Sequence, residues 1–157
     1  MIRKLIFAAA SLTSTAALAA PAPVFLTDAI RGNFSEVTLG RLIQNRAASP
    51  QVRQFGATLV RDHSNGLAQA QQIAARLRLR IPATLTPEAR SERVLLQRLG
   101  GRAFDREVRR YMINDHIKDI AKFKAQARSG DRATAGYAAA TVPIMQNHLA
   151  TARSIRA

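Results

Sequence analysis

The chain has 157 residues, and its 24 Lys and Arg against 10 Asp and Glu give a formal net charge of +14 at pH 7. It contains no cysteine, which excludes disulfides and a lipoprotein anchor, and no tryptophan. The length suits one domain whose core is built mainly from aliphatic side chains.

Residues 1–19 have the pattern of a cleaved export signal. Arg3 and Lys4 give a positive start, an apolar run follows, and residues 17–19 offer a small-x-small cleavage site. The run is too short and too rich in alanine and serine to span a membrane, and no later stretch is apolar enough to do so. We therefore expect a mature domain, residues 20–157, in the bacterial periplasm without a lipid anchor.

Hydrophobic periodicity predicts four long helices and one short helix, without strands. A cap followed by proline opens two of them, at Ser49-Pro50 and Thr86-Pro87. Pro143 lies inside the last helix and should kink it. The expected helices are Val24–Ala47, Pro50–Arg78, residues 87–99, Phe104–Ser129 and a last helix capped by Asp131.

Short loops join the first two long helices and the last two. The link between these pairs, residues 79–103, is much longer and contains the short helix. A link of this length can traverse a bundle. The predicted fold is therefore all-α, a ferritin-like four-helix bundle with one long crossover that contains a short extra helix.

The three histidines occupy equivalent positions in three of these helices. Around each of His63, His116 and His148, the residues eight and four positions before and four and seven positions after are apolar. Positions with these spacings share one face of a helix. Each histidine therefore lies within the inward, apolar face of its helix.

Glu36 interrupts the inward face of the first helix in the same way. Four inward polar groups, one from each long helix, could meet at one level of the core. A Glu with three His suits Zn²⁺, Fe²⁺, Mn²⁺ or Cu²⁺. The predicted metal ligands are Glu36, His63, His116 and His148, and the alternative is a polar cluster in the core that holds no metal.

The residues immediately before the histidines are Asp62, Asp115 and Asn147. They lie about 100° around the helix from each histidine. In that position they could orient the metal ligands through hydrogen bonds, or simply face solvent.

Enzymatic functions have less support. A ferritin-type di-iron centre needs Glu-x-x-His, and no acidic residue precedes any histidine by three positions. Non-covalent haem is conceivable with Met112 or Met145, but a methionine on a helical stripe is usually part of the core. The pattern favours binding, storage or stress protection over fast turnover, and an oxidase is the weakest interpretation.

The basic residues are spread along the chain, so an arginine-rich solvated surface is one explanation of the charge. Such a surface also favours anionic partners: lipopolysaccharide, phospholipid headgroups or acidic proteins. Nucleic acid is not expected, because the chain is predicted to be exported and lacks interleaved aromatic residues. The alternative function is therefore an envelope interaction protein that works through its basic exterior.

An ordered set of motifs covers about Val24 to Ile155: Gly32–Gly40 (GNFSEVTLG), Asp62-His63-Ser64, Phe104-Asp105, Met112-x-x-Asp115-His116 and Pro143-x-x-x-x-His148. This set resembles the ferritin-like domain of unknown function 4142, a family of exported bacterial envelope proteins. The resemblance implies a ferritin-like bundle and an envelope location, but no settled activity.

The family motif carries over to Glu36, Asp62, His63, Phe104, Asp105, Asp115, His116 and His148. Phe104 and Asp105 are expected to be structural, with Asp105 capping or contacting the first turn of its own helix. Val108 departs from the family pattern, because a tyrosine is usual there.

Overall fold

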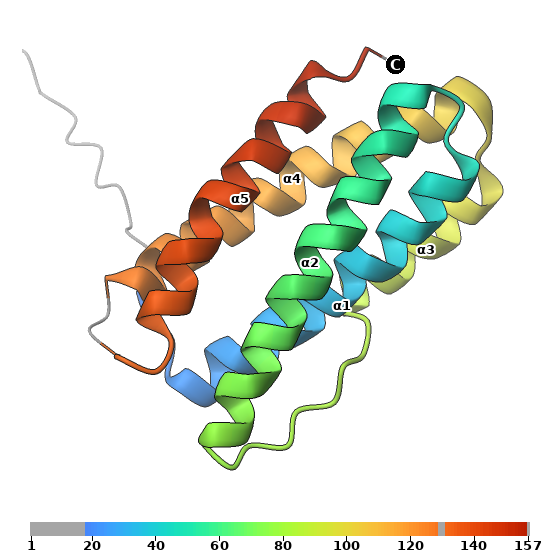
Figure 1. The fold of residues 1–157 in the computed structure, drawn as a ribbon. Coiled ribbons are helices and arrows are strands. Elements are labelled where there is room, and N and C mark those ends of the chain that lie inside the picture. Colours follow the sequence, from blue (N-terminus) through green and yellow to red (C-terminus); the bar gives the residue numbers. More distant parts are fainter. Residues whose placement is uncertain (1–17, 129–130, 157) are drawn as a thin grey trace, which may run out of the picture.

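The computed structural model describes residues 18–128 and 131–156, and over these residues it is helical without strands (Figure 1). Most of the predicted export signal, residues 1–17, lies outside the described residues. The helices are α1 (Ala22–Arg46), α2 (Pro50–Arg76), α3 (Pro87–Arg98), α4 (Gly101–Ala127) and α5 (Ala135–Ser154). The predicted all-α class is therefore confirmed.

Two helices begin as the sequence predicts. The Ser49 hydroxyl accepts a hydrogen bond from the Val52 backbone N–H at 3.1 Å, and Pro50 takes the first helical position of α2. At the start of α3 the Thr86 hydroxyl likewise accepts from Ala89 at 3.1 Å. Each hydroxyl satisfies a backbone donor that the first helical turn leaves free.

Two other starts differ from the prediction. Helix α4 begins at Gly101, three residues earlier than predicted. Gly101 has a φ of +54°, a left-handed conformation that glycine takes without steric cost. Asp131 is not the cap of α5, which begins at Ala135. Its carboxylate accepts from Ala133 N at 3.0 Å, so that it organises the turn before the helix.

The predicted role of Asp105, a contact in the first turn of its own helix, is wrong. Its two carboxylate oxygens accept hydrogen bonds from Ala48 N at 2.9 Å and Ser49 N at 2.8 Å, at the loop between α1 and α2. Asp105 therefore fixes the start of another helix. Phe104 beside it is fully buried, and the Arg46 guanidinium lies 5.8 Å from its ring centroid.

The long helices form two hairpins, α1 with α2 and α4 with α5, which meet where α2 packs on α5. Figure 1 shows the link after α2 returning along the bundle, through α3, to the start of α4. The α1–α2 crossing is tight at Gly40 and Gly56, where a Cβ on Gly56 would lie 2.8 Å from the Gly40 carbonyl oxygen. No helix of the described residues is long and apolar enough to cross a membrane.

The buried apolar residues form two clusters, one toward each end of the bundle. One cluster includes Leu39, Phe55, Phe104, Met112 and Ile155, and the other includes Phe25, Ile30, Ala70, Phe123 and Met145. Between them every long helix contributes buried polar groups. This polar layer consists of Asn33 and Glu36 on α1, His63 on α2, His116 on α4 and His148 on α5.

Candidate metal centre

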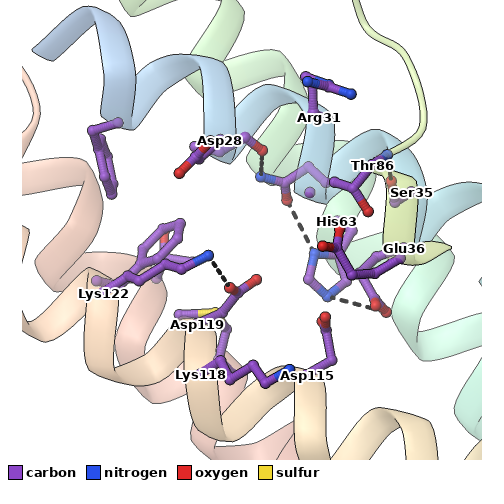
Figure 2. A pocket seen from close by; sticks show the side chains of 18 of the residues that line it. Asp28, Arg31, Ser35, Glu36, His63, Thr86, Asp115, Lys118, Asp119 and Lys122 are labelled. Atoms are coloured by element: carbon purple, nitrogen blue, oxygen red, sulfur yellow. Dashed lines mark hydrogen bonds and ion pairs between the residues drawn. The ribbon is translucent and has the colours of Figure 1, made fainter. Parts of the chain in front are cut away.

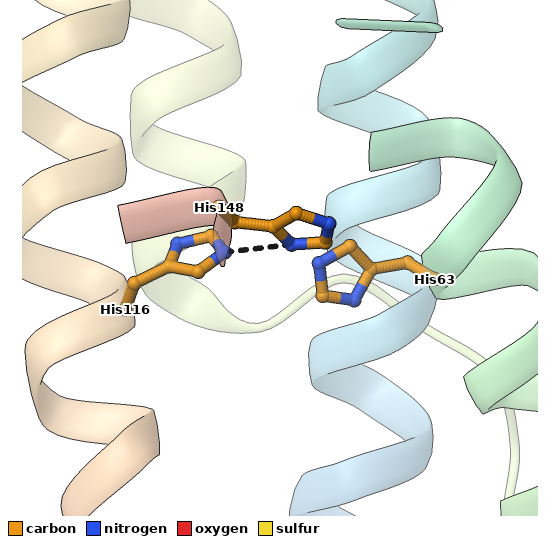
Figure 3. A group of neighbouring side chains, drawn as sticks. All are labelled: His63, His116 and His148. Carbon is orange, nitrogen blue, oxygen red and sulfur yellow. Dashed lines mark hydrogen bonds between the residues drawn. The ribbon is translucent and has the colours of Figure 1, made fainter. Parts of the chain in front are cut away.

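The three histidines converge in the middle of the polar layer (Figure 3). His63, His116 and His148 come from three helices and are buried, and their ring centroids lie 5.2, 5.4 and 5.9 Å apart. One ring nitrogen of each lies within 4.8 Å of the others. This spacing would let a single metal ion touch all three after small side-chain adjustments.

The hydrogen bonds around Asn33 determine the tautomer of His63. The Asn33 side-chain N–H₂ donates to the Ala29 carbonyl at 2.7 Å and to the Tyr137 hydroxyl at 3.0 Å. The amide oxygen is therefore the atom 3.0 Å from His63 Nδ1, and it can only accept. His63 Nδ1 must carry the hydrogen, which leaves the lone pair on Nε2, a buried nitrogen without a hydrogen-bond partner.

The tautomers of His116 and His148 are also determined by their hydrogen-bond partners. His116 Nδ1 lies 3.0 Å from the Met112 carbonyl oxygen, and His148 Nε2 lies 2.9 Å from Asp62 Oδ2. Both oxygens are acceptors, so these nitrogens carry the hydrogens. In the neutral rings, the lone pairs of His116 Nε2 and His148 Nδ1 then face each other at 3.3 Å. Only a shared proton or a bound cation relieves their repulsion.

Burial favours the neutral form of all three rings. It lowers the pKa of His63 well below its usual value, lowers that of His116 to about 3, and lowers that of His148 even though Asp62 opposes the shift. For Asp62, burial works to raise the pKa, but hydrogen bonds from Arg61 and His148 outweigh it. The result is three neutral imidazoles, the form that binds metals.

Glu36 lies beside the three histidines. Its side chain is 3% exposed, its Oε2 is 4.0 Å from His63 Nε2, and neither carboxyl oxygen accepts a hydrogen bond from a nitrogen or hydroxyl donor. Its carboxylate groups with Asp115 and one nitrogen of His116, all within 4.8 Å of one another. Burial and the neighbouring Asp115 raise the pKa of Glu36, and burial raises that of Asp115 as well.

A cavity of about 500 Å³ adjoins this group between α1 and α4 (Figure 2). His63, Glu36 and Asp115 all line it. The cavity is large enough to hold several water molecules or a small ligand. The centre therefore has a route to exchangeable ligands on the side of His63 and Glu36.

The three residues that precede the histidines have different environments. Asp62 orients a histidine, but one on another helix: it accepts the hydrogen bond from His148 rather than from its neighbour His63. Asp115 points to Glu36 and the cavity (Figure 2). Asn147 is exposed on the outside of α5. The sequence left two roles open for these residues. Asp62 orients a candidate metal ligand through a hydrogen bond, and Asn147 faces solvent.

Sequence reasoning missed Asn33 and Tyr137, which complete the contacts of His63. The signal was present in the phase of α1, because Asn33 follows Ala29 by four positions and precedes Glu36 by three. Asn33 therefore lies on the inward face and needs a buried partner. Tyr137 supplies it and donates from its hydroxyl to the Gly66 carbonyl at 3.2 Å.

The fold and the site define a helical-bundle protein with a buried three-histidine centre next to an acidic cavity. The chain belongs to the family described as Domain of unknown function (DUF4142), whose model matches residues 7–155. The family resemblance of its motifs is thereby confirmed. The comparisons matched the chain to none of the curated proteins and to none of the solved structures.

Proposed function

We propose that this protein binds one transition-metal ion through His63 Nε2, His116 Nε2 and His148 Nδ1. One observation carries the proposal: the outer nitrogen of each ring donates to an oxygen, which leaves three inner lone pairs directed toward one another. Histidines that coordinate metals characteristically donate their second N–H to a carboxylate, a carbonyl or water. Here a side-chain amide, a backbone carbonyl and a carboxylate supply the three acceptors.

Three imidazoles suit Zn²⁺, Cu²⁺ and Fe²⁺, with Mn²⁺ a further candidate where a carboxylate joins them. Structural zinc sites use four protein ligands, whereas three ligands leave a position for water or another exchangeable ligand. The cavity and Glu36 adjoin this centre, and Glu36 is our candidate for a fourth protein ligand. The arrangement therefore supports reversible metal or small-ligand binding in storage or stress protection.

The connection through α3 supports a ferritin-like topology, with the ion at mid-height between the two hairpins. The Glu-x-x-His ligands of di-iron bundles have no counterpart around these histidines. We also infer a periplasmic location, because residues 1–19 have the composition of an export signal.

The test is elemental analysis of untagged protein after incubation with each of the four ions and removal of the excess. We expect about one tightly held ion per chain for at least one metal. His116→Ala and His148→Ala should abolish it, whereas Asn147→Ala, an exposed neighbour of the site, should not. Retention of the ion in His116→Ala would contradict the proposal. So would substoichiometric metal throughout, which would favour a metal-free cluster with a proton between His116 and His148.

A second candidate function is binding of anionic envelope lipid or lipopolysaccharide by the basic exterior. It is favoured by the burial of three acidic side chains, Glu36, Glu92 and Asp105, which therefore offset little of the basic charge on the outer surface. Binding to anionic vesicles should then weaken with salt and survive His116→Ala. Absence of vesicle binding at low ionic strength would exclude this function.

A further inference from the structure

Half of the acidic residues of this basic chain gather around one cavity. Of its 10 Asp and Glu, five line the cavity between α1 and α4: Asp28, Glu36, Glu88, Asp115 and Asp119. Three cationic side chains also line it: Arg31, Lys118 and Lys122. Clustered carboxylates in a cavity with low-dielectric walls concentrate a negative potential, which attracts cations.

In the part of the chain that the structure describes, no lysine or arginine forms an ion pair with Glu36 or Asp115. Lys122 Nζ lies 3.4 Å from Asp119 Oδ1, and Arg31 donates to the Leu85 carbonyl at 3.1 Å. Glu36 is 3% exposed, and both of its oxygens lack a nitrogen or hydroxyl donor. A buried carboxylate without such a partner is costly, so this site needs a proton or a cation.

Glu36 and Asp115 face each other across this position (Figure 2). Two carboxyl groups can share a hydrogen bond only when one of them is protonated. A divalent cation would neutralise both instead. Mg²⁺ and Mn²⁺ are commonly held by one or two carboxylates, with water completing their coordination, and the cavity has room for that water.

We infer that Glu36 and Asp115 hold a second, oxygen-preferring divalent cation beside the three-histidine centre. A nitrogen of His116 lies within 4.8 Å of carboxylate oxygens from both residues, so the two ions would be immediate neighbours. The inference deepens the proposed function and rests on it for the first ion. Asp115 is not among the ligands proposed for the first ion, whereas Glu36 adjoins both positions, so Asp115 tests the second site separately.

The experiment adds Mn²⁺ to protein already loaded with Zn²⁺ and follows free Mn²⁺ by its electron paramagnetic resonance signal. Wild-type protein should bind about one Mn²⁺ per chain, and Asp115→Asn and Glu36→Gln should each weaken that binding about tenfold or more. Glu88→Gln is the matched control, because it removes an exposed carboxylate from the same cavity. It should change Mn²⁺ affinity by no more than about twofold.

Equal Mn²⁺ affinity in wild type and in both Asp115→Asn and Glu36→Gln overturns the inference, as does absence of Mn²⁺ binding to the wild type. Zinc content, measured in the same samples, separates this failure from failure of the proposed function. Protein that retains zinc but binds no Mn²⁺ has the first site without the second. Protein without zinc that binds Mn²⁺ in an Asp115-dependent manner supports the inference and shows that the three-histidine centre does not hold zinc.

Discussion

A Cβ atom on Gly66 would lie 2.5 Å from the Oδ1 atom of Asn33. That oxygen accepts the hydrogen bond that fixes the tautomer of His63. The Gly66 carbonyl in turn accepts from the Tyr137 hydroxyl, which holds the other end of the Asn33 amide. Gly66 lies one turn after His63 on α2. Because it has no side chain, it leaves the space that the Asn33 amide occupies.

We therefore expect Gly66→Ala to weaken metal binding although it removes no ligand. The new methyl group would displace the Asn33 amide and leave His63 Nδ1 without its acceptor, which should cost about tenfold in affinity. Competition with a chromogenic chelator measures this. Gly136→Ala is the matched control, because its Cβ would meet nothing within 4 Å. Equal affinities of the two variants would show that Asn33 does not orient the ligand.

Asp62→Ala should weaken metal binding about 10- to 100-fold, because His148 loses the carboxylate that keeps its hydrogen on Nε2. Asp62 also pairs with Arg61 at 2.8 Å. Arg61→Ala removes that surface ion pair and leaves the contact with His148 intact, so it should leave the affinity nearly unchanged. Chelator competition on the two variants distinguishes them, and a larger loss in Arg61→Ala would refute this role of Asp62.

Gly56→Ala should destabilise the fold by on the order of 1 to 3 kcal/mol, because the α1–α2 crossing has no room for a methyl group. Its Cβ would lie 2.6 Å from the backbone nitrogen of Gln44 and 2.8 Å from the Gly40 carbonyl oxygen, and neither backbone atom can move without shifting a helix. Urea unfolding gives the free energy. Gly32→Ala, whose nearest contact would be 3.9 Å away, should be at least as stable as the wild type. Equal stability of the two variants would contradict the tight crossing.

Glu92 should make the stability of the fold depend on pH. It is buried, its Oε1 has no hydrogen-bond partner, and burial with the neighbouring Glu107 raises its pKa from 4.5 to about 7 although Arg110 opposes the shift. A carboxyl group with a raised pKa in the folded state contributes stability that is present below the unfolded pKa and is lost as pH rises through the folded value. The contribution of Glu92 should therefore disappear between about pH 4.5 and pH 7.

Glu92→Gln removes this titration and keeps the shape of the side chain. As the pH rises from about 5 to about 8, the unfolding free energy of the variant should increase relative to that of the wild type by on the order of 1 to 3 kcal/mol. Urea unfolding at the two pH values measures the gain. If wild type and variant differed in unfolding free energy by the same amount at both pH values, Glu92 would not titrate in this range.

Much of the local structure could be predicted because its causes lie within a few residues. Ser49-Pro50 and Thr86-Pro87 begin helices through their own backbone and hydroxyl groups. The period of 3.6 residues assigns the histidines to inward faces without knowledge of the neighbouring helix. The prediction failed where a partner comes from far along the chain, as for Asp105, whose acceptor role depends on the loop before α2.

The sequence by itself determined that His63, His116 and His148 lie on inward faces in equivalent frames, because helical periodicity is a local property. It could not determine the surroundings of the residues that precede them. Asp62 contacts His148 of another helix, Asp115 contacts Glu36, and Asn147 faces solvent. Only the tertiary structure decided these contacts, because they depend on how far each helix is shifted and rotated against its neighbours. That register is set by packing, such as the contact of Gly40 with Gly56, and not by any single segment.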